Sequence, residues 1–171
     1  LSLSAEGQMT DTACTVCAQT PSGTVSDLAD SSTDRLDLVA RLEHGWGKTH
    51  TLRGEFSSLS LNDAGLGVGG YDLPERAYDQ DRREIVAALT DNGVIFGRMA
   101  SEIRFQSRFE SLGFTPGVTS PSVRVNGAFN SGGAGVSGGR DSRDLQLVSN
   151  LDLSVGKKHA LRFGALLRDL T

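Results

Sequence analysis

The clearest pattern along the chain is an alternation of apolar and polar residues with a period of two. In "MASEIRFQSRF", residues 99–109, Ile103, Phe105 and Phe109 lie on one side, whereas glutamate, glutamine and arginines occupy the other. A strand places successive side chains on opposite faces, whereas a helix would scatter these arginines around its circumference. This stretch therefore predicts a β-strand with one apolar and one polar face.

The same alternation recurs in three further stretches and, more loosely, in two others. The clear stretches are "RLDLVARLE" at residues 35–43, "DLQLVSNLDLSV" at residues 144–155 and "HALRFGALLRDL" at residues 159–170. The looser ones are "LSLSAEG" at residues 1–7 and "THTLRGEFSSL" at residues 49–59. Together these stretches predict an all-β chain.

The segment from Pro74 to Gly93 is ambiguous, because Pro74 could open a helix and Gly93 could end one. Within it, "DQDRRE" at residues 79–84 has no apolar side chain, so a helix across 74–91 would have no continuous stripe to bury. We therefore interpret the segment as a polar loop followed by a short strand near residues 84–91. The chain then contains about six or seven strands, which we expect to form an antiparallel meander.

Short and long connections alternate between these strands. The short turns are "HGWGKT" at residues 44–49, "TDNGVIFG" at residues 90–97 and "VGKK" at residues 155–158. The long loops are expected at residues 8–33, 62–81 and 110–142. Loops beyond about 12–15 residues are uncommon in compact domains and are usually functional. Alternation of short turns with long loops is typical of an outer-membrane β-barrel.

Two glycine-rich stretches fit the dinucleotide-binding spacing G-x-G-x-x-G: "GLGVGG" at residues 65–70 and "GAGVSG" at residues 133–138. The motif needs a strand before it and a helix after it, so that the helix N-terminus holds the pyrophosphate. A strand pattern follows the second match, and Pro74 with a polar run follows the first. We therefore interpret the glycines as turn formers. A nucleotide-binding α/β enzyme using Gly65–Gly70 stays an alternative, which a helix across 74–91 would favour.

Composition narrows the function further. The 171 residues carry a net charge of -4, and their lysines and arginines are scattered, which argues against nucleic acid as a partner. The chain has no G-x-S-x-G motif, and its three histidines lack metal-ligand spacing. We therefore assign no catalytic, metal or cofactor residue and expect a protein that is not an enzyme.

Cys14 and Cys17 form a single C-x-x-C motif in a stretch rich in Ser, Thr and Asp. A zinc site would need further ligands, and a thioredoxin-like motif belongs beside a βαβ unit. A disulfide between the two cysteines, stapling a loop in an oxidising compartment, is the reading we favour. Two free thiols and redox or metal chemistry are the alternatives.

Three stretches resemble successive barrel segments of TonB-dependent outer-membrane receptors. They are "GVGGYDLPERAYD", "VRVNGAFNSGGAGVSGGRDSRD" and "GKKHALRFGALLRD". The branch they resemble carries an N-terminal carboxypeptidase-regulatory-like domain in its full-length members. The resemblance covers roughly residues 34–170 and rests on strand and loop patterns.

The resemblance implies a 22-stranded transmembrane barrel with a plug domain, which binds and imports a nutrient with energy from the TonB complex. We find no plug, TonB box or carboxypeptidase-like domain, and Thr171 is not the aromatic residue that ends a complete barrel. We therefore expect residues 1–171 to be an internal part of such a barrel. Its partners would be outer-membrane lipid, the remaining barrel and plug, the TonB complex and a small nutrient. Its location would be the outer membrane of a Gram-negative bacterium, with the long loops outside.

Five residues of the long loops could stack on or pair with a ligand. These are Tyr71, Arg76, Tyr78, Phe129 and Arg140. Trp46, in a short turn, fits either the interfacial aromatic belt of a barrel or a turn-packing role. Periodicity does not separate the polar interior of a barrel from the solvated face of a soluble sheet. A soluble secreted β-sandwich-like binding module, stapled by Cys14 and Cys17, is therefore the main alternative.

Overall fold

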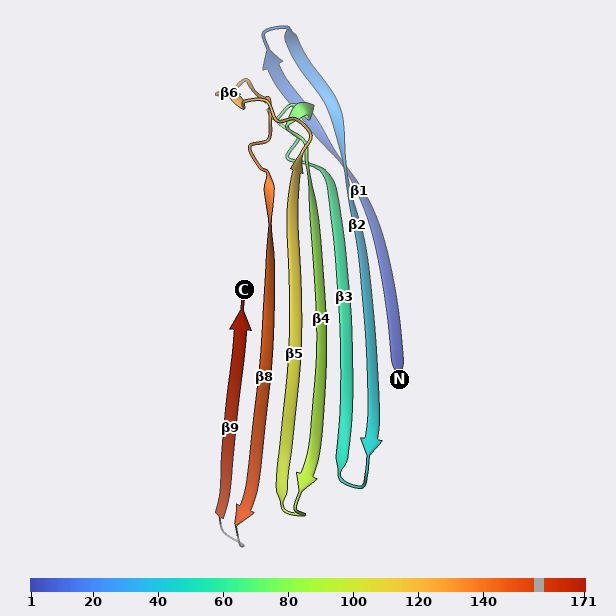
Figure 1. The fold of residues 1–171 in the computed structure, drawn as a ribbon. Helices are drawn as coiled ribbons and strands as arrows, with labels where there is room; N and C mark the ends of the chain where they lie inside the picture. The colour runs from blue at the N-terminus through green and yellow to red at the C-terminus, as the bar shows by residue number, and fades with distance from the viewer. Residues whose placement is uncertain (156–158) are drawn as a thin grey trace.

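The computed structural model describes residues 1–155 and 159–171, which are built almost entirely from antiparallel strands (Figure 1). Seven long strands form one sheet in the order β1-β2-β3-β4-β5-β8-β9. Their bounds are β1 Ser2–Thr20, β2 Gly23–Trp46, β3 His50–Leu66, β4 Tyr78–Ile95, β5 Met99–Pro116, β8 Gly138–Val155 and β9 His159–Leu170. A small hairpin, β6 Val123–Val125 and β7 Phe129–Ser131, forms a separate two-stranded sheet.

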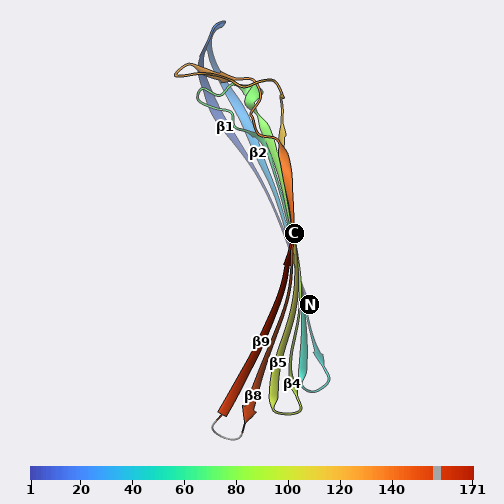
Figure 2. The same cartoon turned by 60° about the vertical axis from the view of Figure 1, so that its left-hand side comes forward.

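The predicted all-β meander is confirmed, and the sheet is open. Its two edges are β1 and β9, which do not pair with each other. Figure 2 shows that the sheet is a single layer that twists and curves along its length. β4 and β5 each have 18 residues and so span roughly 60 Å at about 3.3 Å per residue. Strands of globular proteins usually have only about 3–10 residues.

Because the strands pair in regular register, the residues that share one face of the sheet can be identified from strand to strand. One row of directly paired residues joins Leu42, Gly54, Leu89, Phe105, Leu147 and Leu167 across six strands. Every member of this row is apolar or glycine. We call this side of the sheet the belt face and the opposite side the charged face. The alternation predicted from residues 99–109 thus extends across the sheet.

Two predicted loops are shorter than expected, and the third is a hairpin. Residues 8–33 belong to β1 and β2, which pair without interruption from Ser2↔Arg41 to Thr20↔Gly23. The loop prediction was wrong here because neither face of this part carries an apolar stripe. The other two loops shrink to residues 67–77 and 117–137. The short turn predicted at 155–158 falls on residues 156–158, which lie outside the described residues.

The polar run at residues 79–84 is a strand and not a loop. β4 begins at Tyr78, so the prediction of a short strand near 84–91 was too short. Charged side chains of this run are compensated by partners on β5, where Arg82 lies 3.1 Å from Glu110. Ion pairs between side chains of β4 and β5, and not an apolar stripe, therefore support the strand in this run.

The helix required by the nucleotide-binding alternative is absent from the described residues. After Gly70 the chain makes only the three-residue 3₁₀ turn η1, Pro74–Arg76, and then enters β4. Gly65, Gly67 and Gly70 have φ of 72°, 83° and 60°. These values lie in the left-handed region that glycine adopts without strain, so the turn-former reading is confirmed here.

One glycine on the belt face is covered by a neighbouring side chain. Gly93 of β4 pairs directly with His50 of β3, and a Cβ added at Gly93 would overlap the imidazole ring. The His50 ring also places its Nδ1 2.9 Å from Asp91 Oδ2. Glycine at residue 93 therefore leaves the space that the His50 ring occupies.

We expect Gly93→Ala to lower the free energy of unfolding by about 1–3 kcal/mol, because the methyl group displaces the His50 ring and breaks its contact with Asp91. Urea unfolding followed by circular dichroism measures the change. Gly113→Ala is the matched control, since a Cβ at Gly113 of β5 meets no atom within 4 Å. Equal losses in the two variants would contradict this role of Gly93.

Candidate functional site

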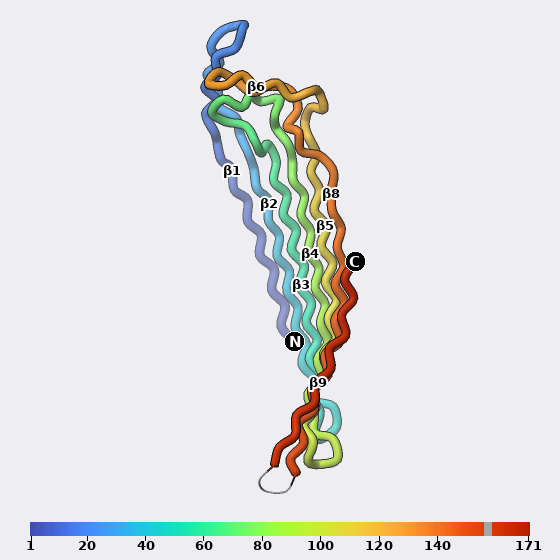
Figure 3. The backbone as a smooth tube through the Cα atoms, turned by 90° about the vertical axis from the view of Figure 1, so that its left-hand side faces the viewer, coloured from blue at the N-terminus to red at the C-terminus, as the bar shows by residue number. Residues whose placement is uncertain are grey.

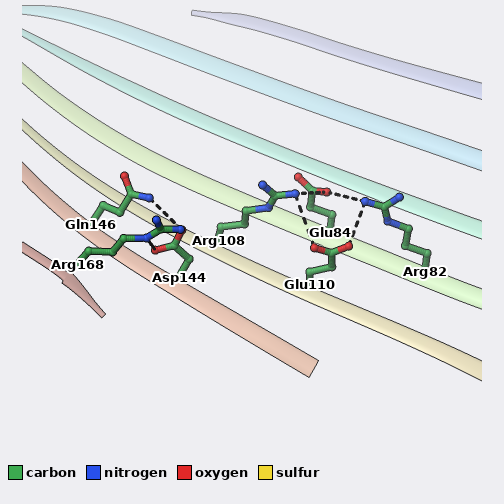
Figure 4. Close-up of polar contacts among 7 residues, drawn as sticks. All are labelled: Arg82, Glu84, Arg108, Glu110, Asp144, Gln146 and Arg168. Carbon is green, nitrogen blue, oxygen red and sulfur yellow. Dashed lines mark hydrogen bonds and ion pairs between the residues drawn. The ribbon is translucent and has the colours of Figure 1, made fainter. Parts of the chain in front are cut away.

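The charged face carries ion pairs between neighbouring strands. Its central cluster, the glutamate–arginine cluster, consists of Arg82 and Glu84 on β4 with Arg108 and Glu110 on β5 (Figure 4). Glu84 and Glu110 are direct cross-strand partners, an arrangement of like charges that is unfavourable alone. Each arginine reaches both carboxylates and offsets this repulsion.

The distances within the glutamate–arginine cluster favour crossed pairing. Arg108 Nη2 lies 3.1 Å from Glu84 Oε2, and Arg82 Nη2 lies 3.1 Å from Glu110 Oε1. The contacts from Arg82 to Glu84 and from Arg108 to Glu110 are longer, at 3.6 and 3.7 Å. The four side chains thus form a closed, charge-balanced ring between β4 and β5.

A second group links β8 to β9 on the same face. Arg168 donates to both carboxylate oxygens of Asp144, at 3.0 and 2.7 Å, and Gln146 donates to Asp144 at 2.9 Å (Figure 4). Towards the short turns, Arg53 likewise donates to Glu43 at 2.9 Å. Ion pairs on this face therefore join β2 to β3, β4 to β5 and β8 to β9.

The belt face has the opposite character. No other described part of the chain covers its large apolar side chains, and Leu89, Phe105 and Phe163 are 48%, 46% and 56% exposed. Trp46 ends β2 on this side, at the short turn, and is 68% exposed. An apolar surface of this extent on a folded chain indicates contact with a membrane or another protein.

The two long loops form a cap over one end of the charged face. We define the cap as residues 67–77 and 117–137. Figure 3 shows both loops crossing towards β1 and β2 at the end opposite the short turns. Beneath them lie Val16 and Ala18 of β1, which pack with Leu73 of the cap in the only buried apolar cluster of the described residues.

Arg76 ties the two loops of the cap together. Its Nε lies 2.8 Å from Asp72 Oδ1, and its Nη1 donates to Ser122 Oγ at 2.7 Å and to the Gly133 carbonyl at 3.2 Å. Asp72 in turn accepts a bond from the Asn130 side chain at 3.0 Å. With a side chain only 15% exposed, Arg76 is a structural tie between segments far apart in sequence.

The structure brings some of the predicted ligand residues together. Tyr71, Arg76 and Phe129 all belong to the cap, where Phe129 packs against the buried cluster and Tyr71 is 51% exposed. Tyr78 lies at the start of β4 and contacts Phe114, with ring centroids 6.3 Å apart. Arg140 is separate from them, on the exposed start of β8. Ligand binding by these residues stays a prediction, and Tyr71 and Arg140 are the two with exposed side chains.

Sequence reasoning missed Asp72 and Asn130, the polar partners within the cap. No local pattern marks either residue, because their contact joins loops that are 58 residues apart in the chain.

The predicted disulfide is not formed in the structure. Cys14 and Cys17 are both free and exposed, in the unbroken part of β1 that pairs with β2. Residues three apart in a strand point to opposite faces and are separated by about 10 Å, beyond the reach of a disulfide.

The described residues contain no group of three or more His, Cys, Asp or Glu side chains arranged to hold a metal ion. They also contain no helix that is long and apolar enough to cross a membrane. Comparison with known proteins identifies no matching protein family, no similar curated protein and no similar solved structure.

We expect Arg76→Met to loosen the cap while leaving the sheet intact. The variant keeps the aliphatic stem but loses charged hydrogen bonds that contribute about 2 kcal/mol or more together. Amide hydrogen exchange in residues 117–137 should accelerate roughly thirtyfold, with exchange in β4 and β5 unchanged. Arg124→Met, on exposed β6, is the control. Unchanged exchange in both variants would show that Arg76 does not hold the loops.

Proposed function

We propose that residues 1–171 form part of the barrel wall of a TonB-dependent outer-membrane receptor. In this arrangement the belt face contacts lipid and the charged face lines the interior. The whole protein binds a scarce nutrient at the cell surface and imports it with energy from the TonB complex. The transport activity, the plug and the TonB partner rest on the sequence resemblance alone.

The observation that carries the wall proposal is the uncovered apolar belt. Burial of apolar surface contributes about 25 cal/mol per Å², so a belt crossing six strands is unfavourable in water. On β8 the belt runs from Leu145 to Leu153, about 26 Å along the strand. The apolar band of an outer-membrane barrel is about 25 Å tall. Lipid would therefore cover the belt without a second protein layer.

The charged face supports the same arrangement. Large barrels have polar interiors, where charged side chains on neighbouring strands stay hydrated or paired. The glutamate–arginine cluster and the Asp144–Arg168 pair suit such an interior. The ends of the sheet also differ as in these barrels, with short turns at one end and the cap at the other (Figure 1).

Strand direction indicates how the barrel would be completed. In a seven-stranded antiparallel meander the first and last strands run the same way, so β1 and β9 cannot close the sheet by an antiparallel pair. Closure with antiparallel neighbours needs an odd number of additional strands. A 22-stranded barrel would supply fifteen, which is compatible with the proposal.

A soluble β-sandwich would need a second sheet over the belt, and the described residues supply none. This alternative is therefore kept as an outcome of the experiment.

Cell fractionation tests the location and size of the native polypeptide. An antibody raised against residues 117–137 should detect a band several times larger than 18.1 kDa in the outer-membrane fraction. Its size follows from the further strands that closure requires. A band near 18 kDa in the soluble fraction would instead favour the secreted module and would end the receptor proposal.

Matched arginine substitutions on β8 test which face meets lipid. Leu147→Arg places a charge on the belt face and should cost about 2–4 kcal/mol near the middle of the bilayer, strongly reducing the amount in the outer membrane. Asn150→Arg lies on the charged face of the same strand and should be tolerated. Immunoblots of membrane fractions measure both. Equal amounts of the two variants would contradict the assigned orientation.

A further inference from the structure

We propose that the open edge of β1 over residues 3–13 pairs with an antiparallel strand of the same barrel wall, and that this strand ends before Thr15. The inference rests on the proposed function for the identity of the partner. It goes further by fixing where the neighbouring strand stops and which backbone groups it bonds.

The backbone of β1 shows which groups face the open edge. Outside β2, the bonds of β1 involve the Thr15 carbonyl and the amides of Cys17 and Gln19. These residues all have odd numbers, and β1 pairs with β2 in unbroken register. By strand alternation, the amides and carbonyls of the odd residues from Leu3 to Ala13 point to the same edge. These groups have no partner among the described residues, and such a row is a template for one more strand.

The cap occupies the continuation of this edge. Gly70 donates to the Thr15 carbonyl at 2.9 Å and accepts from the Cys17 amide at 2.7 Å. Gln19 donates to the Ala128 carbonyl at 3.0 Å. A neighbouring strand cannot bond these groups while the cap does, so it must end or turn away before Thr15.

The belt face continues to this edge and indicates the character of the partner. Leu3 and Met9 of β1 are 77% and 83% exposed, whereas Leu38 and Leu147 on interior strands are 36% and 40% exposed. The extra exposure arises because β1 has a neighbour on one side only. The partner is therefore a strand of about ten residues whose apolar side chains alternate with polar ones and extend the belt beyond Leu3 and Met9.

A second copy of this chain does not fit the edge. Neighbouring copies with the same orientation in a membrane would bring β9 beside β1 with both strands running in one direction. Pairing β1 with β1 in antiparallel fashion would turn one copy upside down relative to the bilayer. A further segment of the same polypeptide, running opposite to β1, meets both requirements.

Residue-resolved hydrogen exchange on the native polypeptide, purified in detergent, tests the pairing and its limit. The amides of Ala5, Gly7 and Met9 should exchange at least about a hundredfold more slowly than unpaired amides, as slowly as their even-numbered neighbours. In Arg76→Met, the Cys17 and Gln19 amides should lose protection, whereas residues 5–9 keep it. Fast exchange at residues 5–9 in the native protein would overturn the pairing. Unchanged protection at Cys17 and Gln19 in the variant would overturn the limit at Thr15.

Photo-cross-linking in cells identifies the partner. A benzophenone side chain at residue 4 or 8, which lie on the charged face, should join β1 to a peptide of the same polypeptide that lies outside residues 1–171. A cross-link to residues 2–13 of a second copy, or to lipid alone, would overturn the inference while leaving the membrane location intact. A polypeptide found in the soluble fraction would overturn the proposed function, whatever the exchange at the β1 edge.

Discussion

The backbone hydrogen-bond ladder is the interaction on which this molecule depends. Only Val16, Ala18 and Leu73 are buried apolar side chains among the described residues, and the large apolar side chains of the belt are about half exposed. Burial therefore contributes less than in a globular core, and the paired amides and carbonyls of neighbouring strands hold the sheet together. The register of that ladder also determines which side chains share a face. Both the belt and the ion pairs follow from it.

The sequence predicted strands where one face is apolar, because alternation is then visible in a single stretch. Residues 99–109 and 144–155 lie within β5 and β8 for this reason. The sequence did not predict the strands at residues 8–33 and 79–84, because these strands carry polar residues on both faces. There the partner strand decides the conformation, as Glu110 does for Arg82. The sequence of one segment does not show which strand will pair with it. These strands could therefore not be predicted from their own residues.

The roles of the cap residues also could not be predicted from the sequence alone. Loop position and residue type made Arg76 and Phe129 candidates for ligand contact, yet the structure gives each a packing role within the cap. Those roles depend on the approach of two loops that are distant in the chain. Tyr71 and Arg140 differ because their side chains are exposed, and their part in ligand binding stays a prediction.

The contacts of the cap also imply an order of assembly. Neighbouring strands such as β4 and β5 are joined by a short turn, so their contacts are local and form quickly. Arg76 instead meets Gly133, 57 residues away, across two loops that must first be positioned by β3, β4, β5 and β8. We therefore expect the contacts of the cap to form after the strands of the hairpins have paired. The bonds of the cap can form only where these strands stand in native register, so an intact cap reports that register.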